Sequence, residues 1–146
     1  MKKFIISIDQ GTTSSRAILF DLKGKPVFSS QKEFTQYFPK SGWVEHDPEE
    51  IWRTTVKTLR DVIAKAKKLK GKILTIGITN QRETTVLWDK KTGKTVYRAI
   101  VWQDRRQADY CKKLKNQNKE TLIFNKTGLP IDSYFSGYPP MPCYHP

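Results

Sequence analysis

The stretch DQGTTSSR near the start of the chain sets an acid, a glycine and four hydroxyl side chains between the apolar runs FIISI and AILF. A tight turn can point successive backbone N–H groups into one concavity, and glycine leaves room for a bulky anion. Thr12, Thr13 and Ser14 add hydroxyl donors, and Arg16 can neutralise a phosphoryl group. Asp9 would repel phosphate directly, so its presence predicts an intervening cation, Mg²⁺ held mainly through water.

The same stretch has a second interpretation, an ordinary hairpin tip. A Walker loop would read GxxxxGK[ST] and lead into a helix. Here the hydroxyl run leads into AILFDL, which is a strand pattern. Threonine-rich turns between strands can be purely structural, so the stretch by itself leaves both interpretations open.

A second pair of chemically active residues, Arg82 and Glu83, follows the apolar run ILTIGIT. Neighbouring residues in an extended strand point to opposite faces, so this pair cannot share one ligand within a regular strand. We therefore expect the strand to end near Thr79 and NQRE to form a loop or bulge. Ligands of open α/β sheets usually bind at such carboxyl ends of strands. The structural alternative is a surface ion pair.

Short apolar segments separated by turn signals predict the elements that position these residues. A meander of strands is expected over Phe4–Ile8, Ala17–Leu22 and Val27–Phe34. The loop TQYFPKSGWVEHDP follows it. Glu45 and His46 in this loop could be taken for an acid/base pair, but loop structure is the better interpretation.

A helix with a well-marked start comes next. Asp47 can cap it, Pro48 suits its first position, and Glu50 lies three residues after the cap. Gly71 is expected to stop it. Its apolar residues recur at steps of three and four and should pack on a sheet. They are Trp52, Val56, Leu59, Ile63 and Ala66.

The second half of the chain predicts further strands and one more helix. Ile73–Thr79 is a continuous apolar run, typical of a buried strand. The segments TTVLWD and TVYRAIVW read as strands on either side of the turn KKTGK. An amphipathic helix is expected from Gln103 to about Asn116. Asp104 would lie at its entrance, where capping and local pairing with Arg105 and Arg106 explain this acid and its arginines.

Composition limits the classes of partner and compartment. Lys and Arg number 27 against 14 Asp and Glu, a net charge of +13, which attracts polyanions. Much of the excess lies between residues 57 and 72, a solvated lysine face. The apolar runs are too short to span a bilayer or to form a signal peptide. Cys111, Cys143, His46 and His145 show no metal-ligand or disulfide spacing, so a cytoplasmic protein without membrane contact is expected.

Acid, Gly, Thr and Arg in this order before a strand resemble the first phosphate loop of the actin, Hsp70 and sugar-kinase superfamily. Further segments resemble, in the same order, those of glycerol kinases in the FGGY carbohydrate kinase family: SGWVEHDPEEIW, GITNQRETTVLWD, AIVWQDRR and TGLPIDSYFS. The resemblance runs from about Phe4 to Ser136. It implies an α/β fold, a ribonuclease H-like or actin-like mixed sheet with flanking helices.

By this resemblance the reaction is transfer of the γ-phosphoryl group of ATP to a terminal hydroxyl of glycerol, with ATP and Mg²⁺ as cofactors. The hydroxyl run and arginine of the first turn would hold the phosphates. Arg82, Glu83, Trp102 and Tyr134 would contact glycerol. Arg82 supplies donors, Glu83 accepts, Trp102 covers the carbon edge, and Tyr134 offers a phenol. Without the resemblance, the two aromatic residues would be read as core.

The resemblance stops near Gly137. The expected domain therefore covers residues 1–137 and is an incomplete N-terminal kinase domain. Residues 138–146 are rich in proline and are expected to form a disordered tail. Family members are much longer, and their aspartate base lies downstream of YFS, so no catalytic residue is visible here. A shifted reading frame or premature stop would explain this pattern. We expect the chain to bind nucleotide and glycerol weakly and not to turn over.

Two other functions fit parts of the sequence. A Holliday-junction-type nuclease also begins with a strand, an acid and a Gly-Thr pair, and would use Asp9 and Glu83 as metal-binding carboxylates. Such nucleases need further acids near the C-terminus, and this chain has none after Asp132. Another polyol or sugar kinase of the superfamily would differ at the substrate contacts. The kinase reading implies glycerol and ATP as partners, no nucleic acid, and homo-oligomers among full-length relatives.

Overall fold

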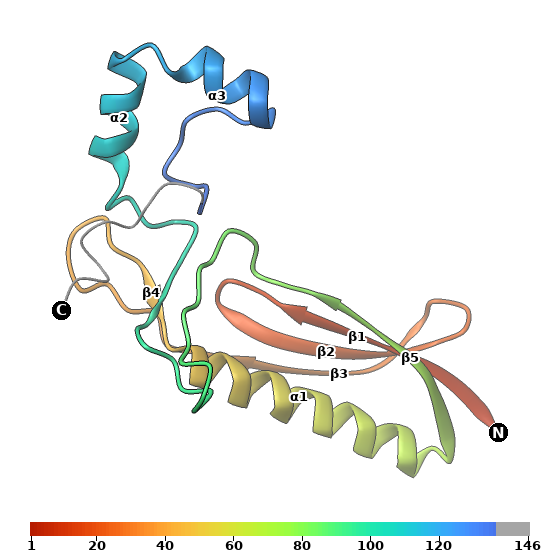
Figure 1. Ribbon diagram of the computed structural model, residues 1–146. Coiled ribbons are helices and arrows are strands. Elements are labelled where there is room, and N and C mark those ends of the chain that lie inside the picture. Colours follow the sequence, from red (N-terminus) through yellow and green to blue (C-terminus); the bar gives the residue numbers. More distant parts are fainter. Residues whose placement is uncertain (137–146) are drawn as a thin grey trace.

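The computed structural model describes residues 1–136, in which a four-stranded mixed sheet and a long helix form the body of the molecule (Figure 1). The strands of this sheet are β1 Lys2–Gln10, β2 Ser14–Asp21, β3 Pro26–Glu33 and β5 Gly71–Thr79. Their order is β3-β2-β1-β5, with β1, β2 and β3 antiparallel and β5 parallel to β1. The predicted meander is confirmed, as is the mixed α/β class.

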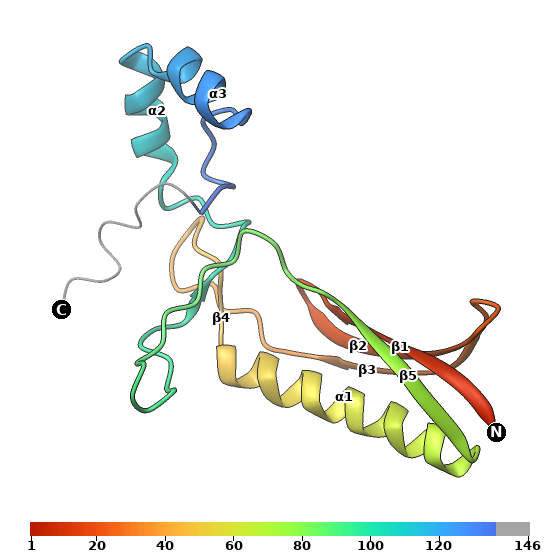
Figure 2. The ribbon, with the colours of Figure 1, turned by 45° about the vertical axis from the view of Figure 1, so that its right-hand side comes forward.

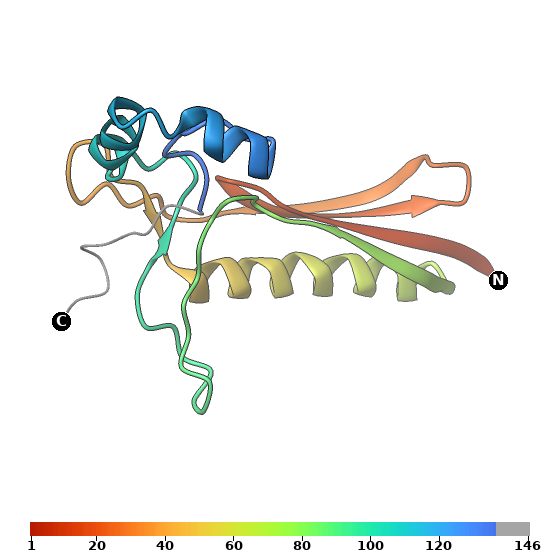
Figure 3. The same cartoon turned by 45° about the horizontal axis from the view of Figure 1, so that its top comes forward.

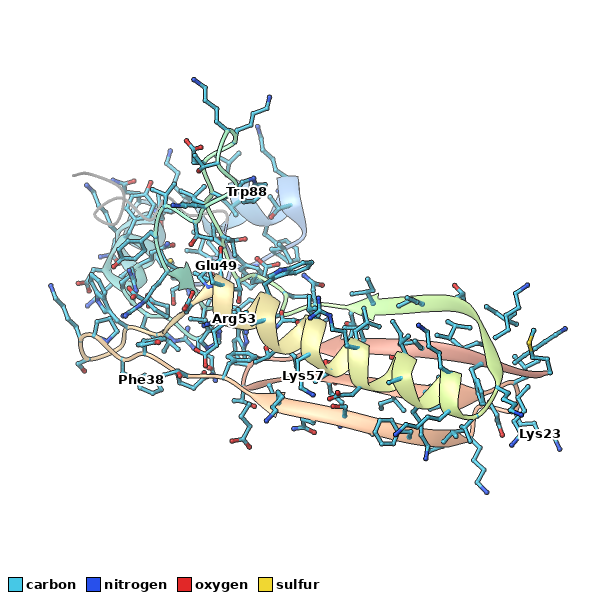
Figure 4. The ribbon with its side chains drawn as sticks, turned by 90° about the horizontal axis from the view of Figure 1, so that it is seen from below. Lys23, Phe38, Glu49, Arg53, Lys57 and Trp88 are labelled. Carbon is cyan, nitrogen blue, oxygen red and sulfur yellow. The ribbon has the colours of Figure 1, made fainter. Side chains whose placement is uncertain are left out.

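Helix α1, Pro48–Lys68, runs along one face of this sheet (Figure 2). Alternate residues of a strand point to one face, and those of β1 and β2 that face α1 form the apolar core. The core residues are Phe4, Ile6, Ile8, Ala17, Leu19, Val62 and Ala66. The predicted cap is present, since Asp47 Oδ1 accepts from the Glu49 amide at 2.9 Å. The opposite face of α1 carries Glu49, Arg53 and Lys57 (Figure 4).

Two details of the predicted α1 are wrong. Trp52 does not pack on the sheet, because the buried stripe runs through Thr58, Val62 and Ala66 and leaves this indole 65% exposed. Gly71 does not stop the helix, since Lys70 takes the left-handed conformation with φ of 51°. Gly71 instead begins β5, where a Cβ atom would lie 2.1 Å from the Phe4 ring.

Strand β5 is not buried as its apolar sequence predicted. Leu74, Ile76 and Ile78 are 47%, 43% and 73% exposed. The strand lies at the edge of the sheet and pairs only with β1 among the described residues. An apolar run is buried only where neighbouring elements cover it, and residues 1–136 supply no such cover on this side.

The remaining elements lie at the end of the sheet far from the amino terminus (Figure 3). They are β4 Glu45–His46, β6 Ala99–Ile100, α2 Ala108–Asn116 and α3 Glu120–Thr127. β4 and β6 pair antiparallel, so the segment predicted as a loop contains a short buried strand. Within residues 1–136, no helix combines the length and apolar character needed to cross a membrane.

Predictions for this second half were only partly right. The two expected strands around KKTGK face each other as a hairpin, but they are joined only by isolated bridges, Thr85–Ile100 and Trp88–Thr95, and do not form a regular two-stranded ladder. The short strand β6 at the end of the second arm pairs with β4 instead. Helix α2 begins later than expected and has Gln107 at its N-cap. Helix α3 was not predicted. Residues 138–146, expected to be a disordered tail, lie outside the described residues.

Candidate functional site

A cleft of about 370 Å³ opens where β1 and β5 end. Its walls come from the end of β1 and the following turn, from the residues after β5, and from two aromatic side chains distant in sequence. The residues are Asp9, Gln10, Gly11, Thr12, Thr79, Asn80, Gln81, Arg82, Trp102 and Tyr134. Five residues singled out from the sequence therefore share one cleft, although they span most of the chain.

The turn between β1 and β2 is closed by a hydrogen bond from the Gly11 amide to the Ser14 carbonyl at 2.9 Å. A Cβ at Gly11 would lie 3.2 Å from that carbonyl oxygen, so glycine suits the close approach. The carbonyls of Gly11 and Thr12 accept from glutamine side chains. Among the described residues, no group accepts a hydrogen bond from the amides of Thr12 or Thr13, so both remain able to bind a ligand.

Asp9 and Arg16 face each other across β1 and β2 and form an ion pair, with Oδ2 and NH2 2.7 Å apart. Both side chains are more than a third exposed, and exposed pairs contribute little stability. Each is therefore able to exchange its partner for a cation or a phosphate group. Thr13, Ser14 and Arg16 do not line the cleft itself; they continue from its edge along β2.

The donor set around Asp9 fits a hydrated cation. Within residues 1–136, no three His, Cys, Asp or Glu side chains come together as a metal cage. Mg²⁺ usually keeps several waters and takes one or two carboxylates plus substrate phosphates. One exposed carboxylate beside a turn with free amides is compatible with that kind of site.

Strand β5 ends at Thr79, as the chemistry of the NQRE segment predicted. Glu83 has φ of 58°, a conformation rare for residues with a Cβ, so the strand alternation is broken at this point. Arg82 lines the main cleft, whereas Glu83 lines an adjoining cavity of about 20 Å³. Tyr134 lines both. Glu83 Oε2 accepts from the amide and the hydroxyl of Ser136, at 3.0 Å each.

Trp102 and Tyr134 form the aromatic wall of the cleft. Their ring centroids are 5.5 Å apart at 65°, a favourable edge-to-face arrangement. Trp102 Nε1 donates to Thr12 Oγ1 at 3.0 Å. This bond ties the aromatic wall to the hydroxyl run of the first turn, a connection that sequence spacing did not reveal.

The segment before α2 is held by a buried ion cluster of Glu45, Asp104 and Arg106. Arg106 NH2 lies 2.8 Å from Glu45 Oε1 and 2.8 Å from Asp104 Oδ2, and each side chain is at most 3% exposed. Asp104 also accepts from the Val44 amide at 2.7 Å. The expected pairing of Asp104 with Arg106 is confirmed, but Arg105 pairs with Asp132 at 3.0 Å instead, and Asp104 does not cap α2. The cluster fixes the turn that carries Trp102.

Sequence reasoning also missed the glutamines beneath the first turn. Gln36 and Gln81 bond to the turn carbonyls and to the ring of His46. Burial is the largest influence on the pKa of His46 and lowers it from the ordinary 6.5. The only sequence signal was a polar residue at each position, which does not distinguish a buried partner from a solvated one.

The sequence as a whole matches known kinases. Residues 4–139 match the profile of the FGGY family of carbohydrate kinases, N-terminal domain. A protein of Alkaliphilus metalliredigens named glycerol kinase is 61% identical over 137 residues, which are 94% of this chain and 27% of that protein. The glycerol kinase of Petrotoga mobilis is 58% identical over 137 residues, 94% of this chain and 28% of the relative. The chain spans about a quarter of the length of these curated relatives.

Solved structures share the fold described above. The crystal structure of Plasmodium falciparum glycerol kinase with ADP superposes with a TM-score of 0.84 and 38% identity, over 92% of this chain and 27% of that one. The gluconate kinase of Lactobacillus acidophilus superposes with a TM-score of 0.82 and 28% identity, over 92% and 26%. The sheet, α1 and the loops around the cleft are thus arranged as in carbohydrate kinases.

Proposed function

This chain belongs to the FGGY family of carbohydrate kinases, and on that premise we propose that it forms the phosphate-binding and alcohol-binding part of a glycerol kinase. The reaction is transfer of the γ-phosphoryl group of ATP to a terminal hydroxyl of glycerol. The observation that supports the proposal is the shared cleft. Asp9 and Thr12 of the first turn lie there with Arg82, Trp102 and Tyr134.

The first turn binds the polyphosphate of ATP. The amides of Thr12 and Thr13, with the hydroxyls of Thr12, Thr13 and Ser14, offer donors to phosphate oxygens. Arg16 leaves Asp9 to neutralise charge that develops on the transferred group. Asp9 then faces Mg²⁺ through water. Positioning and charge neutralisation supply most of the catalysis in such a transfer.

The other wall of the cleft binds the alcohol. Arg82 donates to hydroxyl oxygens, while Glu83, from the adjoining cavity, accepts a hydrogen bond from a hydroxyl group. Ser136 occupies one oxygen of Glu83 and leaves the other available to the substrate. Trp102 covers the carbon edge and Tyr134 adds a phenol group beside it. Glycerol is favoured over larger sugars because the relatives near 60% identity are named glycerol kinases.

The nuclease alternative finds no support. Such an enzyme gathers carboxylates around metal ions, and no cluster of that kind occurs within residues 1–136. The relatives and the superposed structures are kinases. The proposal therefore keeps ATP, Mg²⁺ and glycerol as ligands in the cytoplasm, without nucleic acid or membrane partners, and homo-oligomers among full-length relatives.

Residue-resolved NMR on the 146-residue chain tests the proposal. MgADP should shift the amides of Thr12, Thr13 and Ser14, and glycerol should shift the Trp102 indole. Thr12→Val should weaken MgADP binding about tenfold, as expected for the loss of one charge-assisted hydrogen bond. Thr92→Val, an exposed change at a residue that does not line the cleft, is the matched control. Shifts confined to other surfaces would refute the proposal.

A further inference from the structure

Beneath the turn between β1 and β2, side chains connect the carbonyls of the turn to a buried histidine. Gln36 Nε2 donates to the Thr12 carbonyl at 3.2 Å, and Gln81 Nε2 donates to the Gly11 carbonyl at 3.4 Å. The ring of His46 lies between these amides, 2.6 Å from Gln36 Oε1 and 3.1 Å from Gln81 Nε2. His46 is fully buried. We call Gln36, His46 and Gln81 the histidine relay.

The directions of these hydrogen bonds fix the protonation state of the ring. Gln36 uses its amide hydrogens on two backbone carbonyls, at 3.2 Å each, so its Oε1 accepts from His46 Nε2. Gln81 Oε1 accepts from a threonine hydroxyl at 2.7 Å, so its Nε2 donates to His46 Nδ1. The ring is therefore neutral, with its hydrogen on Nε2. Burial lowers the pKa of His46 and favours the same neutral form.

We propose that neutral His46 is a positioning residue that holds the phosphate turn in its binding geometry, and that protonation of its Nδ1 releases the turn and weakens nucleotide binding. The inference rests on the function proposed above. A trans peptide sets its carbonyl and the next N–H in opposite directions. The relay holds the carbonyls of Gly11 and Thr12. The N–H groups of Thr12 and Thr13 therefore point away from the relay.

Protonation breaks the relay at a definite bond. A hydrogen on His46 Nδ1 would face the NH₂ group of Gln81, so two donors would oppose each other. Gln81 can accept from the ring only by turning its amide over, which replaces the donor to the Gly11 carbonyl with an oxygen. The Gly11 carbonyl then keeps only its bond from Gln10 Nε2 at 2.9 Å, and the relay no longer restrains the peptide plane that orients the Thr12 amide.

The groups packed around His46 are two carboxylates and an aromatic ring, and His46 is the histidine among them. Glu50 of α1 is the charged group that acts on the ring, and it favours the protonated form. Glu45 precedes His46 in β4, points to the other face and pairs with Arg106. Phe34 packs edge-on against the ring at 5.1 Å.

An NMR pH titration of the 146-residue chain from pH ~7.5 to ~5, without ligand, tests the coupling. The His46 ring and the amides of Gly11, Thr12 and Thr13 should move together with a midpoint below 6.5. The amides of the core strands report whether the fold survives. His46→Gln should abolish the movement of the turn amides. Turn amides that ignore the state of His46, or that still titrate in this variant, would overturn the proposal.

MgADP binding measured at the two ends of this pH range supplies the functional test. The nucleotide's own titration is common to all variants, so it cancels in the comparison. From high to low pH, the wild type should lose about tenfold more affinity than His46→Gln, the size expected for one hydrogen bond to the ligand. Gln81→Met should weaken binding at both pH values, whereas Gln117→Met, an exposed matched change, should not. Equal losses of affinity in wild type and His46→Gln would contradict the role of the relay. If the turn amides titrate with His46 but the chain binds no MgADP, the proposed nucleotide-binding function is wrong instead.

Discussion

The turn between β1 and β2 and the loops of residues 80–136 meet at one cleft, but different interactions hold them. The turn joins two strands whose inward residues, such as Leu19, form an apolar core with α1. Beside the site, the described part of these loops contains only the two-residue strand β6, which pairs with β4 from the segment before α1. The ion cluster of Glu45, Asp104 and Arg106 fastens them. The strands that carry the turn are thus positioned by apolar packing, with the histidine relay holding the carbonyls of the turn itself. The loop wall is fastened by the ion cluster instead.

This difference shows which kind of interaction fixes which part of a site. Apolar packing is not directional, so it places a backbone through strand register, as it does for Asp9 opposite Arg16. A polar network is directional and places individual side chains, but only if every partner is satisfied. Loss of one member should therefore damage the loop wall more than the loss of one apolar contact damages the turn wall.

Replacement of Arg106 by Met should have the largest effect. It would leave the carboxylates of Glu45 and Asp104 buried without their guanidinium partner, at a cost of about 3 to 5 kcal/mol in the free energy of unfolding. Urea denaturation measures this loss, and the Trp102 indole signal should shift in the folded state. Arg105→Met, whose side chain is 54% exposed, should cost less than about 1 kcal/mol. Equal losses for the two variants would break the comparison.

Leu19→Ala tests the apolar wall. The side chain is fully buried in the core, so its truncation should cost about 2 to 5 kcal/mol in urea denaturation. The Trp102 indole should keep its chemical shift, because the ion cluster is intact. Leu22→Ala, at a residue 58% exposed, should cost within about 0.5 kcal/mol. An indole shift in Leu19→Ala as large as in Arg106→Met would show that the two walls are not independent.

Acidification should have the smallest effect on stability. The folded state holds His46 neutral with a lowered pKa, so the unfolded chain binds the proton more readily. The stability that His46 contributes is therefore complete above its ordinary pKa of 6.5 and is lost as pH falls from there toward the folded pKa. Denaturation at a series of pH values measures the loss, and His46→Gln should remove it. A wild-type stability that is flat over this range would show that the turn wall does not depend on its histidine.

Much of the first half of the fold was predictable because its signals are local. Short apolar segments separated by turn signals predicted the meander, and the Asp47 cap predicted the start of α1. The residue types of the turn allowed phosphate binding and an ordinary hairpin alike, and the resemblance to the kinase family favoured phosphate binding. The end of β5 at Thr79 was predicted from the requirement that Arg82 and Glu83 serve one ligand.

Other features could not be predicted because they depend on what lies next to a residue. The apolar run of β5 is exposed because no described element covers it. Gly71 is required by the Phe4 ring rather than by its own backbone angle. His46 looked like a loop residue until Gln36 and Gln81 were found on both sides of its ring.

The sequence by itself determined the turn between β1 and β2, the cap of α1 and the resemblance to a kinase family, because each depends on residues close together in the chain. The tertiary structure alone decided which side chains share the cleft and which histidine supports the turn. These contacts join residues that are far apart in the sequence. Hydrogen bonds are directional, so they form only where the fold places donor and acceptor correctly, and residue spacing does not show this.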